Sequence, residues 1–111
     1  MNAILNIYNG CESDTPIKTF VCKRLTVKVG SQIEILSEKI AKLEKSKKGK
    51  SDEEVLKIND EQIELTIETL KMIFPSFTRE DFEGLDPLEY QAFCNEIGKA
   101  TAQIINRAEK N

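Results

Sequence analysis

The chain has 111 residues, of which 40% are hydrophobic and 32% charged, and its formal net charge is −3. These values are typical of one folded domain, too short for two independent cores. The acidic balance argues against a nucleic-acid-binding surface, which needs Lys and Arg to neutralise phosphates. No apolar run approaches the roughly 20 residues that span a bilayer, and the first residues lack a secretory signal pattern, so a cytoplasmic protein without membrane contact is predicted.

Two short strands are predicted near the N-terminus. Apolar residues cluster within residues 2–8, and the side chains of residues 17–22 alternate between the two faces of a strand. The segment between them contains Asn9-Gly10 and Pro16, which are typical of turns. We therefore predict an antiparallel hairpin, whose apolar face must be covered because an isolated hairpin is marginal in water.

A first long helix is predicted after the hairpin, from an apolar stripe of one residue per turn: Val29, Ile33, Leu36, Ile40 and Leu43. Its start has two candidates. Thr26 would cap an early start, whereas Ser31 with Glu34 forms a capping-box pattern further along. We favour the earlier start.

The lysine-rich segment over residues 45–51 has no apolar anchor and predicts an exposed, mobile loop.

The acids of residues 52–54 suit a helix start and predict a brief helix. Asn59 with Gln62 resembles a second capping box, so the second main helix is predicted to begin there. Its stripe is Ile63, Ile67, Leu70 and Phe74.

A joint is predicted over residues 73–87, between the second main helix and the last one. Pro75 disfavours helix at the residue before it, Thr78 can cap a short turn, and Gly84 can close that turn. The joint contains no catalytic signature, so it predicts architecture and no reaction.

The last helix has the best-defined start in the chain. Asp86 is predicted to cap it, Pro87 to take its first position, and Glu89 to complete a reciprocal capping box. Gly98, Ala100 and Ala102 leave room for another helix to approach closely. Its apolar stripe is Tyr90, Phe93, Ile97, Ala100 and Ile104.

Together these elements predict an α+β fold that is mainly α. A hairpin region over residues 1–24 is followed by a helical region over residues 25–111, with three main helices plus short helical turns, in a single domain over residues 1–111.

Enzyme chemistry has little support in the sequence. The chain has no His, which is the commonest general base. The carboxylate groups at residues 52–54, 60–61 and 80–81 are predicted to serve helix starts. Three cysteines without Cys-x-x-Cys spacing predict neither a disulfide framework nor a zinc site, and we expect them to be small buried apolar residues. No catalytic residue, cofactor or metal is therefore predicted.

Four features in order resemble the tail assembly chaperones of long-tailed phages and prophages of Gram-positive bacteria. They are the strand at residues 18–20 running into an Ile- and Glu-rich helix, the Lys-rich break, the segments NDEQIEL and KMIFP at residues 59–65 and 71–75, and FTREDFEGLD at residues 77–86. The resemblance covers most of the chain. It implies a small cytoplasmic protein of the bacterial host, absent from the mature virion, that binds and solubilises the tape measure protein during virion morphogenesis.

The resemblance also implies self-association and contact with the tail tube protein. Because it carries no catalytic motif, it transfers no catalytic residue. The residues expected to contact the client are the apolar and aromatic side chains of the joint and last helix, which are equally compatible with a core: Phe74, Phe77, Phe82, Leu85, Tyr90 and Phe93. The alternative function is a small helical regulatory or nucleic-acid-associated adaptor, for which the lysine run is the sequence support.

Overall fold

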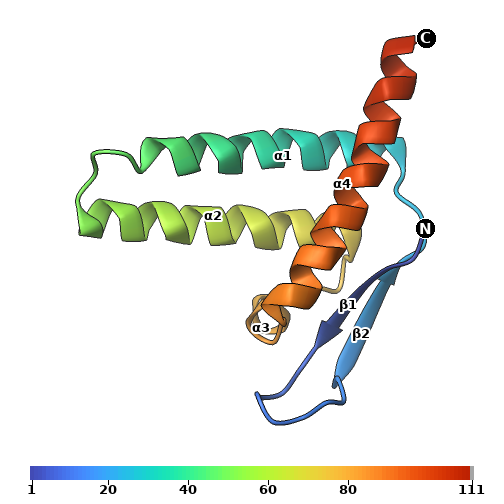
Figure 1. The fold of residues 1–111 in the computed structure, drawn as a ribbon, viewed down its shortest axis with the longest axis horizontal. Helices are drawn as coiled ribbons and strands as arrows, with labels where there is room; N and C mark the ends of the chain where they lie inside the picture. The colour runs from blue at the N-terminus through green and yellow to red at the C-terminus, as the bar shows by residue number, and fades with distance from the viewer. Residues whose placement is uncertain (111) are drawn as a thin grey trace.

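A computed structural model of the chain describes the backbone of residues 1–110 and the surroundings of side chains up to residue 104. It consists of an N-terminal β-hairpin followed by helices, so the prediction of an α+β, mainly α fold is confirmed (Figure 1). Strands β1 (Ala3–Ile7) and β2 (Lys18–Cys22) pair antiparallel, with Leu5 opposite Phe20. No helix among the described residues is long and apolar enough to cross a membrane.

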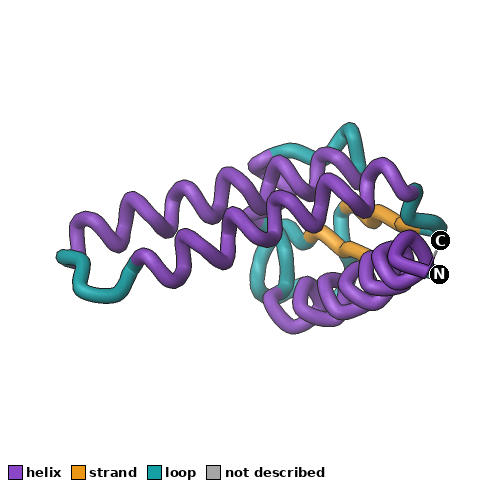
Figure 2. The backbone as a smooth tube through the Cα atoms, turned by 90° about the horizontal axis from the view of Figure 1, so that it is seen from above, coloured by secondary structure: helices purple, strands orange, loops and turns teal. Residues whose placement is uncertain are grey.

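Helices α1 (Val27–Ser46) and α2 (Asp52–Ile73) run antiparallel and form a long helical hairpin. The short helix α3 (Arg79–Glu83) follows, and α4 (Pro87–Lys110) crosses back over α1 and contacts β1. The loop end of the α1–α2 hairpin extends beyond the rest of the molecule in both views (Figures 1 and 2). The other elements gather at its opposite end, where the core lies.

The two faces of the β-hairpin have different surroundings. Leu5 and Ile7 on the inner face of β1 are buried, as is Cys22 on the inner face of β2. Ile4 and Val21, which are paired on the outer face, are exposed. The alternation expected of a strand with one covered face is therefore present, and the helices provide the cover.

Helix α1 begins where the earlier of the two candidate starts placed it. The Thr26 hydroxyl accepts a hydrogen bond from the Val29 N–H at 3.3 Å, so Thr26 is the N-cap. Ser31 and Glu34 lie inside the helix. Gly30 lies inside α1, where a methyl group would meet Ile104 Cδ1 at 2.7 Å. Its lack of a side chain therefore allows α4 to approach α1.

The prediction of a separate brief helix before the second main helix is wrong. Helix α2 is continuous from Asp52, with Ser51 as its N-cap accepting from the Glu54 N–H at 3.3 Å. Asn59 lies in the helix interior, because residues 52–73 contain no Gly or Pro that would interrupt the backbone hydrogen bonds. The acids at residues 60–61 are therefore interior too, whereas those at residues 52–54 do lie in a first turn.

The loop between α1 and α2 is shorter than predicted, because α1 continues through Lys45 and Ser46. The Ser46 hydroxyl donates to the Leu43 carbonyl at 2.7 Å, and the Lys47 N–H donates to the Glu44 carbonyl at 3.3 Å. Gly49 has a φ of 78°, a left-handed conformation that a residue with a side chain rarely adopts. Local polar contacts thus extend the helix into the lysine run.

The joint between α2 and α4 is held by a capping box and a buried acid. Thr78 caps α3 and exchanges hydrogen bonds with Asp81, whose backbone N–H donates to the Thr78 hydroxyl and whose carboxylate accepts from the Thr78 N–H. The same carboxylate accepts from Lys18 Nζ at 3.0 Å. The polar pair therefore ties strand β2 to the joint.

Gly84 ends α3 and lies against strand β1. A methyl group at Gly84 would meet Ile7 Cγ2 and the Tyr8 carbonyl oxygen, each at 2.7 Å. The Tyr8 N–H donates to the Gly84 carbonyl at 2.8 Å. Glycine is required here by this close backbone approach.

Helix α4 starts as predicted, but one detail of the prediction, the reciprocal capping box, is wrong. Asp86 Oδ1 accepts from the N–H groups of Leu88 and Glu89 at 2.9 and 3.1 Å, so Asp86 is the cap. Glu89 does not complete a reciprocal box, because its carboxylate accepts instead from the Tyr8 hydroxyl at 2.8 Å and the Asn6 amide at 3.2 Å. Strand β1 and the residue that follows it thus provide partners that a local sequence pattern does not reveal.

Candidate partner-binding groove

The residues predicted to contact a partner divide into buried and half-buried groups. Phe74, Phe77 and Phe93 are only 7%, 2% and 3% exposed and belong to the core. Phe82, Leu85 and Tyr90 are half-buried and pack against that core. Of the six, Tyr90 and Phe93 also line a groove on the surface.

The core position of the phenylalanines has a simple cause. The Phe20 ring of β2 lies 5.1 Å from the ring of Phe74 and 5.5 Å from that of Phe77, and Phe74 lies 5.8 Å from Phe93. These tilted contacts join the sheet, the joint and α4. Because the rings pack against one another, the joint is an internal support of the fold.

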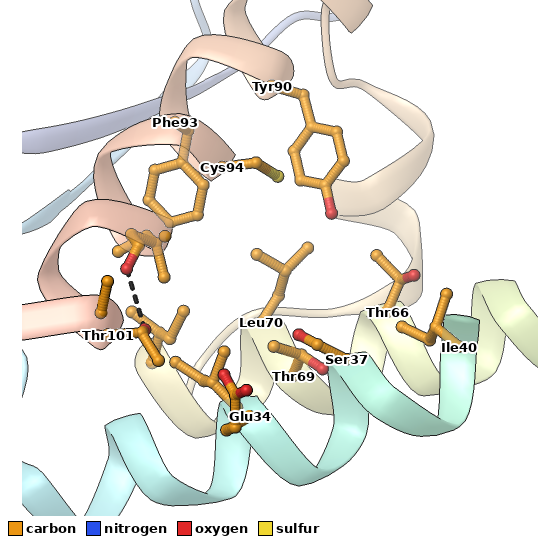
Figure 3. Close-up of a pocket in the computed structure, with 15 residues that line it drawn as sticks. Glu34, Ser37, Ile40, Thr66, Thr69, Leu70, Tyr90, Phe93, Cys94 and Thr101 are labelled. Atoms are coloured by element: carbon orange, nitrogen blue, oxygen red, sulfur yellow. Dashed lines mark hydrogen bonds between the residues drawn. The ribbon is translucent and has the colours of Figure 1, made fainter. Parts of the chain in front are cut away.

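A groove lies between α4 and the α1–α2 hairpin (Figure 3). Its volume is about 320 Å³. α4 packs against α1 near Gly30 and against β1 near its own start, and between these contacts it does not fully cover the hairpin. The groove is therefore a consequence of where α4 crosses.

The deep side of the groove is apolar. Leu70 of α2 and Phe93 and Ile97 of α4 are buried core residues that line it, together with Ile33 of α1. In Figure 3, Leu70 lies in the middle of the groove. The side chains of α4 are on one side of it, and those of α1 and the rest of α2 are on the other. An apolar side chain from a partner could enter here without leaving a polar group unpaired.

The threonines of the groove direct their hydrogen-bond donors into their own helices. The Thr66, Thr69 and Thr101 hydroxyls donate to the carbonyls four residues earlier at 2.8, 2.8 and 2.9 Å. Their donors are therefore already used, and the groove offers few unsatisfied donors to a polar small molecule.

Tyr90 and Cys94 lie together at the α4 side of the groove (Figure 3). Burial, with the nearby Cys94, raises the pKa of Tyr90, and burial also raises the pKa of the Cys94 thiol. Both groups are therefore neutral at physiological pH, and a protonated thiol is a poor nucleophile. The arrangement suits apolar contact and not covalent chemistry.

The prediction that all three cysteines are buried is wrong for Cys11. Cys11 is exposed in the loop between the strands, Cys22 is buried, and Cys94 is half-buried in the groove wall. The long loop leaves Cys11 in contact with water, whereas Cys22 lies on the inner face of β2. No disulfide links them among the described residues.

A second, wider hollow of about 610 Å³ lies beside the strand loop and the start of α4. It is lined by acids, including Asp86 and Glu89, whose oxygens already accept hydrogen bonds from the helix start and from Tyr8. The Glu89 carboxylate raises the pKa of the Tyr8 hydroxyl. Within the described residues, no group of three or more His, Cys, Asp or Glu could hold a metal ion.

The lysine run is partly neutralised by neighbouring acids. Lys47 Nζ lies 2.7 Å from Glu44 Oε2, and Lys50 Nζ lies 3.7 Å from Glu54 Oε2. Glu44 also accepts from Gln62 across the helical hairpin at 2.9 Å, and the Lys47 and Gln62 hydrogen bonds lower its pKa. These contacts give Lys47 and Lys50 a role within the helical hairpin.

Comparison of the chain with protein-family models, with curated proteins and with solved structures finds no match. Sequence reasoning did not find the groove, because its walls come from three helices distant in sequence. One signal was present, since Cys94, Gly98 and Ala102 repeat every four residues on α4 and all line the groove.

Proposed function

We propose that this protein is a tail assembly chaperone, which binds amphipathic helical segments of a phage tape measure protein in the bacterial cytoplasm and keeps them soluble until the tail is built. The observation that carries the proposal is the apolar groove between α4 and the α1–α2 hairpin. Its place and lining suit an amphipathic helix that lays its apolar face into a surface groove.

The physical logic concerns a client that aggregates unless it is covered. A tape measure is a long, largely helical polypeptide with apolar stripes, and exposed stripes of this kind associate with one another. A small protein with a shallow groove would cover one short segment at a time. Many weak contacts along one client give avidity while each remains easily displaced, which suits release to tail tube subunits.

Isolated apolar residues on the surface are compatible with this role but do not define the site. Leu88 of α4 is 83% exposed, and Leu56 of α2 and Ile17 beside β2 are also exposed. They lie on different elements and do not line the groove. Scattered residues of this kind occur on most proteins, so the groove is the feature that we assign to client binding.

Co-expression tests the proposal. The tape measure gene from the same genome is expressed alone and together with this chain, and the soluble fraction of the tape measure protein is measured after centrifugation. We expect a clear increase in the soluble fraction and co-purification of the two proteins.

An unrelated insoluble protein expressed with the chain provides the control and should stay insoluble. An equal tape measure yield in the pellet with and without the chain would refute the proposed function.

A further inference from the structure

We propose that the groove selects one class of helix, in which a Lys or Arg lies beside the apolar stripe. The basic group would pair with Glu34 on α1, while the helix backbone approaches α4 over Cys94, Gly98 and Ala102. This inference rests on the proposed function and specifies which segments of the client are bound.

The charge of the groove supports this selectivity. Among the residues whose side chains the structure describes, Glu34 is the only charged one that lines the groove, and it is half-buried at the α1 wall (Figure 3). In the part of the chain that the structure describes, Glu34 takes part in no ion pair and no side-chain hydrogen bond. A basic side chain from a partner would therefore meet a carboxylate that no described side chain neutralises, and an acidic one would be repelled.

The shape of the α4 wall supports a helix as the occupant. Cys94, Gly98 and Ala102 are small residues spaced four apart, so they lie along one side of α4. A methyl group added at Gly98 would meet no atom within 4 Å, which places open space beside the helix backbone. Small side chains allow two helix axes to come close, whereas large ones would hold them apart.

The size of the groove sets the limit on what enters it. About 320 Å³ is at the lower end of the range of roughly 300–1,000 Å³ for small-ligand sites. The space is sufficient for a few apolar side chains above Leu70 and between the walls. The occupant that fits the charge, shape and size is therefore one face of a single amphipathic helix, with its remaining faces in water.

Two fluorescent synthetic peptides test the charge selectivity. Both are amphipathic helices with large apolar residues at positions i and i+4, and they differ only in a Lys or a Glu beside the stripe. Binding to the full chain is measured by fluorescence anisotropy at low and high salt.

We expect the Lys peptide to bind about two- to fivefold more tightly than the Glu peptide, which is the upper part of the range for one partly exposed ion pair. Glu34→Lys should reverse the preference, Glu34→Gln should remove it, and salt should reduce it. Equal affinities of the two peptides for the native chain would overturn the charge assignment.

Gly98→Leu tests the position of the helix. It should weaken both peptides at least tenfold, because the leucine fills the approach to α4. The melting temperature should not fall, since the new side chain enters open space and leucine favours helix over glycine. Ala92→Leu, which adds leucine at an exposed α4 position outside the groove, is the matched control and should leave binding unchanged.

Sedimentation and the co-expression assay separate the remaining outcomes. A native dimer that Gly98→Leu converts to monomer would mean that a second copy occupies the groove, and would overturn this inference. If the Gly98→Leu and Glu34→Lys variants solubilise the tape measure as well as the native chain, the chaperone proposal stands and the groove assignment fails. If the peptides bind as expected but the chain neither solubilises nor binds the tape measure protein, the helix selectivity stands and the proposed function fails.

Discussion

Replacing Asp81 by alanine should destabilise the protein by about 2 kcal/mol. The carboxylate is buried and has two structural tasks, since it accepts from the Thr78 N–H at 3.0 Å and from Lys18 Nζ at 3.0 Å. Loss of a helix-start hydrogen bond costs about 1 kcal/mol. The ion pair with Lys18 contributes up to about 1 kcal/mol to stability, which is the upper end for an exposed ion pair. We take the upper end because the Asp81 side chain is buried, although that of Lys18 is half-exposed.

The effect should depend on pH in one direction. Burial opposes ionisation of Asp81, but the hydrogen bonds from Lys18 and Thr78 outweigh it, so its pKa lies below the ordinary value. A lowered folded-state pKa contributes stability that is present above the unfolded pKa of about 4 and is lost as pH falls through the folded pKa. The difference between the native chain and Asp81→Ala should therefore be largest near neutral pH and shrink in acid.

Urea unfolding followed by circular dichroism measures both points. At pH 7 a loss of about 2 kcal/mol corresponds to a midpoint lower by roughly 1 M urea, which is easily resolved. Lys18→Met, alone and combined with Asp81→Ala, gives a double-mutant cycle that isolates the pair. The reasoning is refuted if the loss is the same at pH 7 and below about pH 3, or if the two substitutions are simply additive.

Four further substitutions test the fold, each by thermal or urea unfolding. Phe77→Ala should cost about 3–5 kcal/mol, because its ring is buried among other rings; a loss below about 1 kcal/mol would mean that Phe77 is not a core residue. Gly84→Ala should cost about 1–3 kcal/mol through overpacking against β1, and an unchanged or higher stability would contradict the close approach. Ser51→Ala should lower the free energy of unfolding by about 1 kcal/mol, whereas Asn59→Ala should not lower it, since only Ser51 caps α2. A larger loss for Asn59→Ala than for Ser51→Ala would mean that a helix starts at Asn59.

Local features of the chain were readable from the sequence because their causes are local. Thr26 and Asp86 each cap a helix through atoms within three residues, and Pro75 ends α2 through its own ring. The alternation of the strands and the apolar stripes of the long helices follow from fixed periods of 2.0 and 3.6 residues. Such features require no knowledge of what lies on the other side of the molecule.

The errors have the opposite origin. Asn59 with Gln62 has the form of a cap, but an uninterrupted run of helix-compatible residues keeps α2 continuous. Glu89 also fits a capping pattern, yet Tyr8 and Asn6 of the hairpin region, more than 80 residues earlier, take its carboxylate. In both cases a competing set of hydrogen bonds decides the outcome, and in the second it comes from a distant segment.

The candidate site shows the same division. The large apolar side chains of the joint and α4 were readable from the chain, because composition and period do not depend on the fold. Whether each one is buried became clear from the packing, in which Phe74 and Phe77 support the core while Glu34, Leu70 and Gly98 meet around a groove. Burial depends on how distant elements approach, since Gly30 allows α4 to contact α1 and Gly84 brings the segment before α4 against β1.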